Sequence, residues 1–238
     1  ATTEPAVSAL EQRINAAPSR RDELLREFQE RREQRTQALR LAEVQAGIRR
    51  VALGAGAPME FLPVAAGAVP RTGGTLRFTR PFWIAAKPVT QSQWQALMPR
   101  DNTPERQRGP ELPSRMMYWV QAGEFCEKLT AQERAAGRLP AGYVYSLPTE
   151  AELEFAYAVY GNTPGLGSLL ARDDPTRRGW SEWTLDNFAP PVTGDLTDPP
   201  PAPTGEGKVA RITTGGRYSR TGGSGDEMVL RIVLRPVR

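Results

Sequence analysis

The chain has 238 residues with a formal net charge of +4, no histidine and one cysteine, Cys126. The absence of histidine excludes Ser-His-Asp and Cys-His catalytic arrangements, zinc sites built on imidazole, and iron sites with two histidines and a carboxylate. One cysteine also excludes an internal disulfide. Arginine supplies almost all of the positive charge, which fits either an anionic partner or an arginine-rich, solvated surface.

No apolar run of the sequence approaches the roughly 20 residues that a membrane-spanning helix needs, so we expect no transmembrane segment. The chain begins at Ala1 instead of Met. We therefore expect a periplasmic protein whose signal peptide has been removed, although a start chosen for expression would look the same.

Residues 19–48 predict an amphipathic helix. Apolar side chains recur there at roughly helical spacing, namely Leu24, Leu25, Phe28, Leu39, Ala42 and Ile48. Arg31, Arg32 and Arg35 interrupt the stripe. Arg31 and Arg35 are candidates for contact with a protein partner, but we favour a helix that packs along its own domain, because charge runs usually face solvent. No aromatic residues alternate with the arginines, as stacking on bases would need, so we expect no nucleic-acid binding.

A run of small residues with a proline, residues 54–58, ends the helical pattern. We predict an N-terminal helical segment over residues 1–56 and a separate folded domain over residues 57–238. Patterning within the domain predicts strands at residues 59–64, 80–90, 143–146 and 228–234, and helices after Thr90 and from Trp119. Residues 99–115 and the proline-rich residues 189–207 are predicted to be irregular.

The clearest helix signal begins at Thr149. Its hydroxyl can cap the first turn, and Glu152 can accept a hydrogen bond from the Thr149 amide, which makes a capping box. The carboxylates of Glu150 and Glu152 also favour the positive end of the helix dipole. With Glu154 they could form an acid–base pair or a site for a hard metal ion, but capping and solvation explain them more simply.

Residues 147–156, which read LPTEAELEFA, resemble the central signature of the sulfatase-modifying-factor domain. This family contains the formylglycine-generating enzymes and many relatives with a C-type-lectin-like fold. Other family features occur in the family's order: an aromatic strand leading into Val89-Thr90, a helix that starts at Trp119, a Trp-rich segment at residues 179–188, and Arg211 followed by paired glycines. The resemblance implies an α+β, C-type-lectin-like domain with much irregular structure, covering roughly residues 59–238.

In the formylglycine-generating enzymes, two cysteines that follow the paired glycines bind copper and oxidise a substrate cysteine. The corresponding residues 218–224 contain no sulfur, so copper would have no thiolate ligands. Cys126 is expected to be a small buried side chain, because it lies on the apolar face of its helix without an evident basic neighbour. We therefore predict no catalytic residue.

Some relatives bind calcium around the motif that reads Glu182-Trp183 here. Glu182, Asp186 and Asn187 have suitable oxygen chemistry and are the candidate Ca²⁺ ligands that the resemblance implies, although the Gly-Asn pair of the family pattern is missing. The alternative, which we favour, is a buried tryptophan pair with a hydrogen-bonded glutamate. No other cofactor is predicted.

The expected function is that of a non-catalytic periplasmic regulator that acts by protein–protein contact. The chain resembles periplasmic regulators of type VI secretion, which implies that it promotes activation of a membrane-spanning threonine kinase. The partner would be the periplasmic part of that kinase or an envelope lipoprotein. Arg217 and Arg220 join Arg31 and Arg35 as candidate partner-binding residues.

Two alternatives remain open. One is a cysteine-independent enzyme of the same fold that modifies a peptide or a peptide-derived substrate in a pocket that includes Glu182, Arg217 and Arg220. The other is a surface that binds carbohydrate, which would need the calcium site.

Overall fold

The structure is a computed structural model that describes residues 22–23, 25–36, 38–39, 42, 44, 46–53, 58–161, 181–205, 207–212, 217–220 and 228–237, with only the backbone given for residues 210–212 and 217–220. The chain forms two compact units, Ala1–Glu43 and Val44–Arg238. In the first unit the described residues are helical, as predicted, and Leu25, Phe28 and Leu39 are exposed. The predicted start of this helix at residue 19 lies outside the described residues.

The second unit begins before the predicted boundary at residue 56. Strand β1 (Arg49–Val51), which lies within the predicted helical segment, pairs antiparallel with β2 (Met59–Val64). Val51 is buried and belongs to the core of this unit. The sheet therefore reaches across the run of small residues into the sequence that precedes it.

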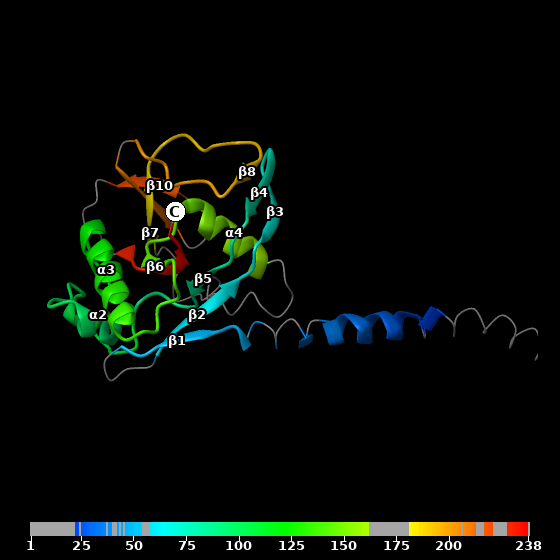
Figure 1. Cartoon of the computed structure of the whole chain (residues 1–238), viewed down its shortest axis with the longest axis horizontal. Helices are drawn as coiled ribbons and strands as arrows, with labels where there is room; N and C mark the ends of the chain where they lie inside the picture. The colour runs from blue at the N-terminus through cyan, green and yellow to red at the C-terminus, as the bar shows by residue number, and fades with distance from the viewer. Residues whose placement is uncertain are drawn as a thin grey trace, which may run out of the picture. The chain divides into compact units, whose positions relative to one another are not determined.

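Three sheets are present among the described residues of the second unit (Figure 1). The five-stranded sheet is antiparallel throughout and has the order β1-β2-β5-β12-β6, in which β5 is Phe82–Ala85, β12 is Val233–Pro236 and β6 is Tyr143–Ser146. The four-stranded sheet has the order β10-β9-β7-β11, formed by Arg217–Arg220, Lys208–Ile212, Ser181–Asn187 and Met228–Val229. The three-stranded sheet has the order β3-β4-β8, formed by Gly67–Arg71, Gly74–Phe78 and Leu196–Thr197.

Three α-helices and one short 3-10 helix are described in the second unit, namely α2 (Gln91–Leu97), η1 (Glu105–Gln107), α3 (Trp119–Ala135) and α4 (Glu150–Gly161). Helix α3 packs against β6 and α2, whereas α4 packs against β7 and the β3–β4 hairpin, beside which it lies in Figure 1. No helix in the described part of the chain has both the length and the apolar character needed to cross a membrane. The segregated helices and the mainly antiparallel sheets confirm the predicted α+β class.

Aromatic side chains fill the core between α3 and the sheets. Trp94 of α2 stacks on Phe125 of α3 with ring centroids 5.3 Å apart and an interplanar angle of 5°. Phe61 and Tyr145 meet across the five-stranded sheet at 5.3 Å. The predicted inner face of α3 is confirmed, since Cys126 and its neighbours Ala122 and Leu129 are all buried.

The β3–β4 hairpin was not predicted. It turns at Thr72-Gly73, where Gly73 has a φ of +78°, a backbone angle that residues with a side chain rarely adopt. A Cβ atom on the next residue, Gly74, would lie 2.4 Å from the backbone carbon of Gly194. These glycines let the hairpin turn and let the segment before β8 approach its backbone closely.

The prediction of a single strand over residues 228–234 was wrong. The chain forms β11 in one sheet, leaves it at Leu230, and forms β12 in another. The bend turns the side chain of Arg231 into the interior, where it is 0% exposed. A strand with simple alternation would instead have placed this charge on a solvent face.

Helix α4 begins with the predicted capping box. The Thr149 hydroxyl accepts a hydrogen bond from the Glu152 amide at 3.0 Å, and a Glu152 carboxylate oxygen accepts one from the Thr149 amide at 2.7 Å. We expect Thr149→Ala to lower the free energy of unfolding by about 1 kcal/mol, because the first turn loses its acceptor. Denaturant unfolding would measure this loss. Thr149→Ser keeps the hydroxyl and is the matched control; an equal loss in both variants would contradict the capping role.

Candidate functional site

Strand β7 carries the Trp-rich motif and lies inside the four-stranded sheet between β9 and β11. Its side chains are buried on both faces: Glu182 is 1% exposed, Trp183 0% and Asp186 6%. The Trp183 indole donates a hydrogen bond to the Met117 carbonyl at 3.1 Å. The motif therefore lies within the packed interior of the domain.

Glu182 forms a buried ion pair with Arg231, with Nε and Oε1 2.8 Å apart and both side chains 1% exposed. The Tyr157 hydroxyl donates to the other Glu182 oxygen at 2.9 Å. The Arg231 guanidinium also donates to the carbonyls of Ala85 at 2.6 Å and Ala86 at 3.0 Å. This network ties β7, α4, the end of β5 and the bend after β11 together, which is a structural role.

The charges of this network compensate each other. Burial alone would lower the pKa of the Arg231 guanidinium, but the attraction of the Glu182 carboxylate more than offsets burial and the pKa lies above its ordinary value. The Arg231 guanidinium therefore stays charged in the interior, beside the Glu182 carboxylate. The predicted hydrogen bonding of Glu182 beside a buried Trp183 is confirmed, and Arg231 is a partner that the sequence alone did not assign to it. Trp180, the other tryptophan of the predicted pair, lies outside the described residues.

Asp186 and Asn187 connect β7 to the proline-rich segment. The Asp186 carboxylate accepts hydrogen bonds from the amides of Glu150 at 2.8 Å and Ala202 at 2.9 Å. Burial raises the pKa of Asp186, although these backbone donors partly oppose the shift. The Asn187 side-chain amide donates to the carbonyls of Ala202 at 3.1 Å and Pro203 at 2.6 Å.

The three candidate calcium ligands therefore do not converge on one point. Glu182 meets Arg231 and Tyr157, whereas Asp186 and Asn187 meet at Ala202. A cation at Glu182 would have to displace a guanidinium that already neutralises it. No group of three or more acidic or sulfur side chains that could hold a metal gathers in the described ranges. The arrangement does not fit a calcium ion, and the calcium prediction rests on the family resemblance alone.

The candidate partner-binding arginines lie in separate parts of the chain. Arg31 and Arg35 are exposed on the N-terminal helix. Arg217 and Arg220 belong to β10, whose backbone pairs with β9, but their side chains lie outside the described residues. Glu182 is 1% exposed in its ion pair and so faces no open pocket, whereas the place of Arg217 and Arg220 in the pocket of the enzyme alternative stays a prediction.

Cys126 lies on α3, belongs to the hydrophobic core of the domain and is 3% exposed. Burial raises the pKa of its thiol above the ordinary value. We expect Cys126 in the folded chain to react with a disulfide reagent at least about a hundredfold more slowly than in the chain unfolded in guanidinium chloride. Absorbance of the released thiolate would follow the reaction, and equal rates in the two states would contradict burial.

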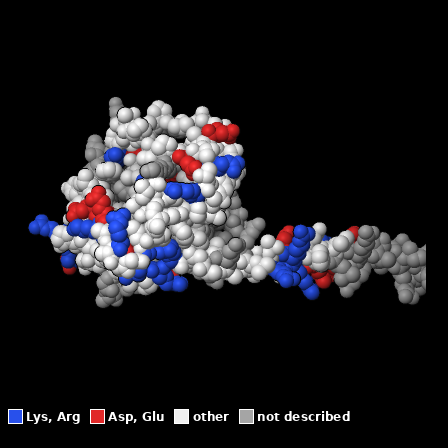
Figure 2. Space-filling view, in the orientation of Figure 1, with Lys and Arg blue, Asp and Glu red and all other residues white. Residues whose placement is uncertain are grey.

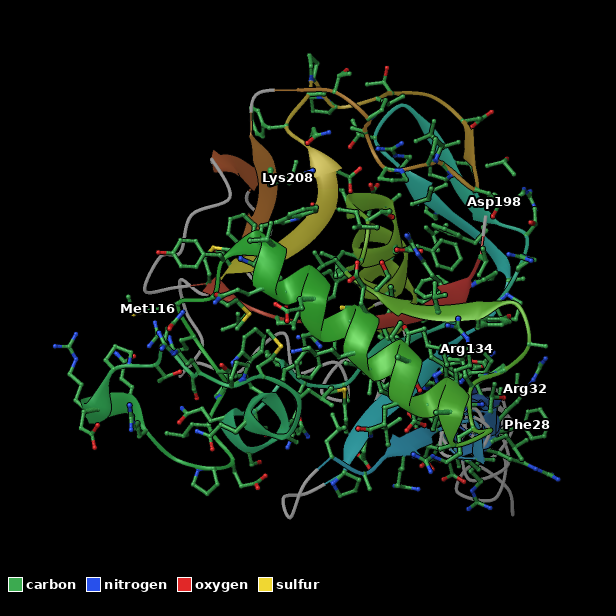
Figure 3. The ribbon with its side chains drawn as sticks, turned by 60° about the vertical axis from the view of Figure 1, so that its left-hand side comes forward. Phe28, Arg32, Met116, Arg134, Asp198 and Lys208 are labelled. Carbon is green, nitrogen blue, oxygen red and sulfur yellow. The ribbon has the colours of Figure 1, made fainter. Side chains whose placement is uncertain are left out.

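A pocket of about 330 Å³ opens elsewhere, at the end of the β4 strand. It is lined by Phe78, Arg80, Phe82, Glu152, Asp198, Arg235 and Pro236. Figure 3 shows Asp198 beside the C-terminal strand β12, which supplies the last two residues. Sequence reasoning missed this pocket, because its walls come from segments far apart in the chain and no local pattern marks them.

The Trp119 indole marks the start of α3 and is half-buried. It donates to the Thr184 carbonyl at 2.8 Å, and the Lys208 ammonium lies 4.1 Å from its ring centroid. Figure 3 shows Lys208 on β9 near this end of α3. Burial lowers the pKa of Lys208. The contact is a cation–π pair that joins α3 to β9.

Comparison with known proteins gives one family and a shared fold. Residues 51–166 match the family model of the sulfatase-modifying factor enzyme 1-like domain. Treponema denticola variable protein 1 is similar in structure, with a TM-score of 0.61 and 19% sequence identity over 79% of this chain and 99% of that one. CarF aligns with a TM-score of 0.43 and 18% identity over 80% of this chain and 99% of its own. No curated protein matches the chain.

Proposed function

We propose that the chain, whose residues 51–166 match the sulfatase-modifying factor enzyme 1-like domain, is a non-catalytic periplasmic regulator that acts by contact with another protein. The proposed partner is the periplasmic part of a membrane-spanning threonine kinase of type VI secretion, which the chain would help to activate. Fold alone does not decide activity, so the proposal depends on the chemistry that the residues allow.

The observation that carries the proposal is the position of the chain's sole cysteine. Cys126 is buried in α3 with a raised thiol pKa, so it is no accessible nucleophile or copper ligand. The sequence contains no second cysteine and no histidine. Glu182, the acidic residue of the Trp-rich motif, is neutralised by Arg231. These residues thus serve the packing of the domain, and the proposed function lies in its exposed surface, which binds a partner.

The exposed arginines of the N-terminal helix support an acidic protein partner. Arg31 and Arg35 lie four residues apart, which places both on the same side of a helix. Two guanidinium groups in this arrangement suit carboxylates on a partner surface. Such contacts set partner choice and association rate more than affinity.

Capture of the tagged full chain from envelope extracts tests this function. We expect a membrane threonine kinase to be recovered, and its recovery to be lost when the kinase's extracytoplasmic region is deleted. The double variant Arg31→Glu/Arg35→Glu should recover less kinase, whereas Arg106→Glu, an exposed arginine in η1, is the matched control. Unchanged recovery after deletion of that region would contradict the proposal. A bound redox metal together with turnover of a peptide would favour the enzyme alternative instead.

A further inference from the structure

The pocket at the end of β4 combines charged walls with an aromatic floor. Phe78 and Phe82 are 5% and 1% exposed, with ring centroids 5.3 Å apart. Phe155 of α4 packs against both rings, with centroids 5.1 Å from Phe78 and 6.4 Å from Phe82. Only Phe78 and Phe82 line the pocket, so its floor is a pair of rings that Phe155 holds rigid, with a small apolar surface left for a ligand.

Two arginines supply the cationic wall. Arg80 is exposed, and its guanidinium donates to the Val237 carbonyl at 2.8 Å. The Arg235 side chain is 13% exposed, and its guanidinium lies 3.4 Å from an oxygen of Glu152, which is long for a charged hydrogen bond. A guanidinium has five N–H donors in a fork that matches a carboxylate, so each of these contacts leaves capacity for a bound anion.

Two carboxylates supply the anionic wall, and both are held in place by the protein. Glu152 is fixed by its capping bond to the Thr149 amide at 2.7 Å. Asp198 accepts hydrogen bonds from the Thr79 amide at 2.9 Å and from the Thr79 hydroxyl. The Asp198 backbone has a φ of +45°, a conformation that Asp and Asn adopt more readily than other side chains. Preorganised oxygens of this kind suit an ammonium group.

We propose that this pocket binds a small zwitterion with an apolar body, of the class of the apolar α-amino acids. A simple anion would face both carboxylates and a simple cation both arginines, whereas a zwitterion places each charge opposite its complement. The apolar body would lie on Phe78 and Phe82. A volume of about 330 Å³ is at the small end of ligand pockets and suits a molecule of this size. Figure 2 likewise shows basic and acidic side chains interspersed over this unit.

Calorimetric titration of the full chain with three related probes tests the charge requirement. L-phenylalanine carries both charges, N-acetyl-L-phenylalanine only the carboxylate, and L-phenylalaninamide only the ammonium. We expect L-phenylalanine to bind about tenfold or more tightly than either derivative, because each derivative leaves one charged wall without a partner. Equal affinity of the three probes, or binding of none of them, would overturn the proposal.

Two variants test the cationic wall and the anionic wall of the pocket one at a time. Arg80→Gln should weaken L-phenylalanine and the N-acetyl derivative alike, by about tenfold. Asp198→Asn keeps the backbone conformation and an acceptor oxygen, so it should weaken L-phenylalanine but not the N-acetyl derivative. Arg100→Gln removes an exposed arginine away from the pocket and should change nothing.

Thermal unfolding of each variant is the check on folding. Arg80 is exposed, so its replacement should leave the melting temperature unchanged, and loss of affinity then reports on the pocket. If Arg80→Gln binds like the unmodified chain, or if Arg100→Gln loses as much affinity as Arg80→Gln does, the assignment of the pocket is wrong. The proposal concerns the pocket alone and does not depend on the protein partner.

Discussion

Replacing Arg231 by methionine is expected to lower the free energy of unfolding by about 3–5 kcal/mol. The variant leaves the Glu182 carboxylate buried without its counter-charge, 1% exposed, and removes the donors to the Ala85 and Ala86 carbonyls. Equilibrium unfolding in urea, followed by circular dichroism, measures the change.

The matched control is Arg50→Met. Arg50 pairs with Glu60 at 2.9 Å, close to the distance in the buried pair, but the two side chains are 58% and 43% exposed. Exposed pairs contribute about 0–1 kcal/mol, so this variant should differ little from the unmodified chain. Similar losses in the two variants would show that burial of the Glu182–Arg231 pair has no special consequence.

Replacing Trp183 by alanine should cost about 3–5 kcal/mol of unfolding free energy. The side chain is 0% exposed in the main core cluster, and its removal leaves a cavity and an unpaired Met117 carbonyl. The same denaturant titration measures this loss, and a lowered melting temperature should accompany it.

Comparison of Trp119→Ala with Trp183→Ala distinguishes the contribution of burial from that of the indole hydrogen bond. Both indoles donate one hydrogen bond to a backbone carbonyl, but Trp119 is only partly buried. We expect a clearly smaller loss for Trp119→Ala than for Trp183→Ala, because less apolar surface leaves water on folding. If the order is reversed, Trp183 is not the packing centre that the structure indicates.

Features that depend on residues close in sequence were predicted well. The capping box at Thr149 involves side chains and amides three residues apart, so its partners can be identified without the fold. The inner face of α3 follows from helical spacing in the same way. The α+β class and the family signature follow from such local patterns taken in order.

Features that join distant residues could not be predicted. Glu182 and Arg231 are 49 residues apart. The sequence predicted a hydrogen-bonded glutamate, with a calcium ligand as the alternative, and placed Arg231 in a strand, so it did not pair the two. Only the bend between β11 and β12 turns Arg231 inward. The pocket could not be predicted for the same reason. Its residues Arg80, Asp198 and Arg235 come together only when the hairpin, the segment after β8 and the last strand are assembled.

The central claim is that this domain acts by contact and not by catalysis. Calorimetric titration of the purified full chain against the purified periplasmic part of the membrane threonine kinase tests it most directly. We predict saturable binding that Arg31→Glu/Arg35→Glu weakens by about tenfold and that Arg106→Glu leaves unchanged. Absence of binding, together with conversion of a peptide substrate by the same preparation, would contradict the claim.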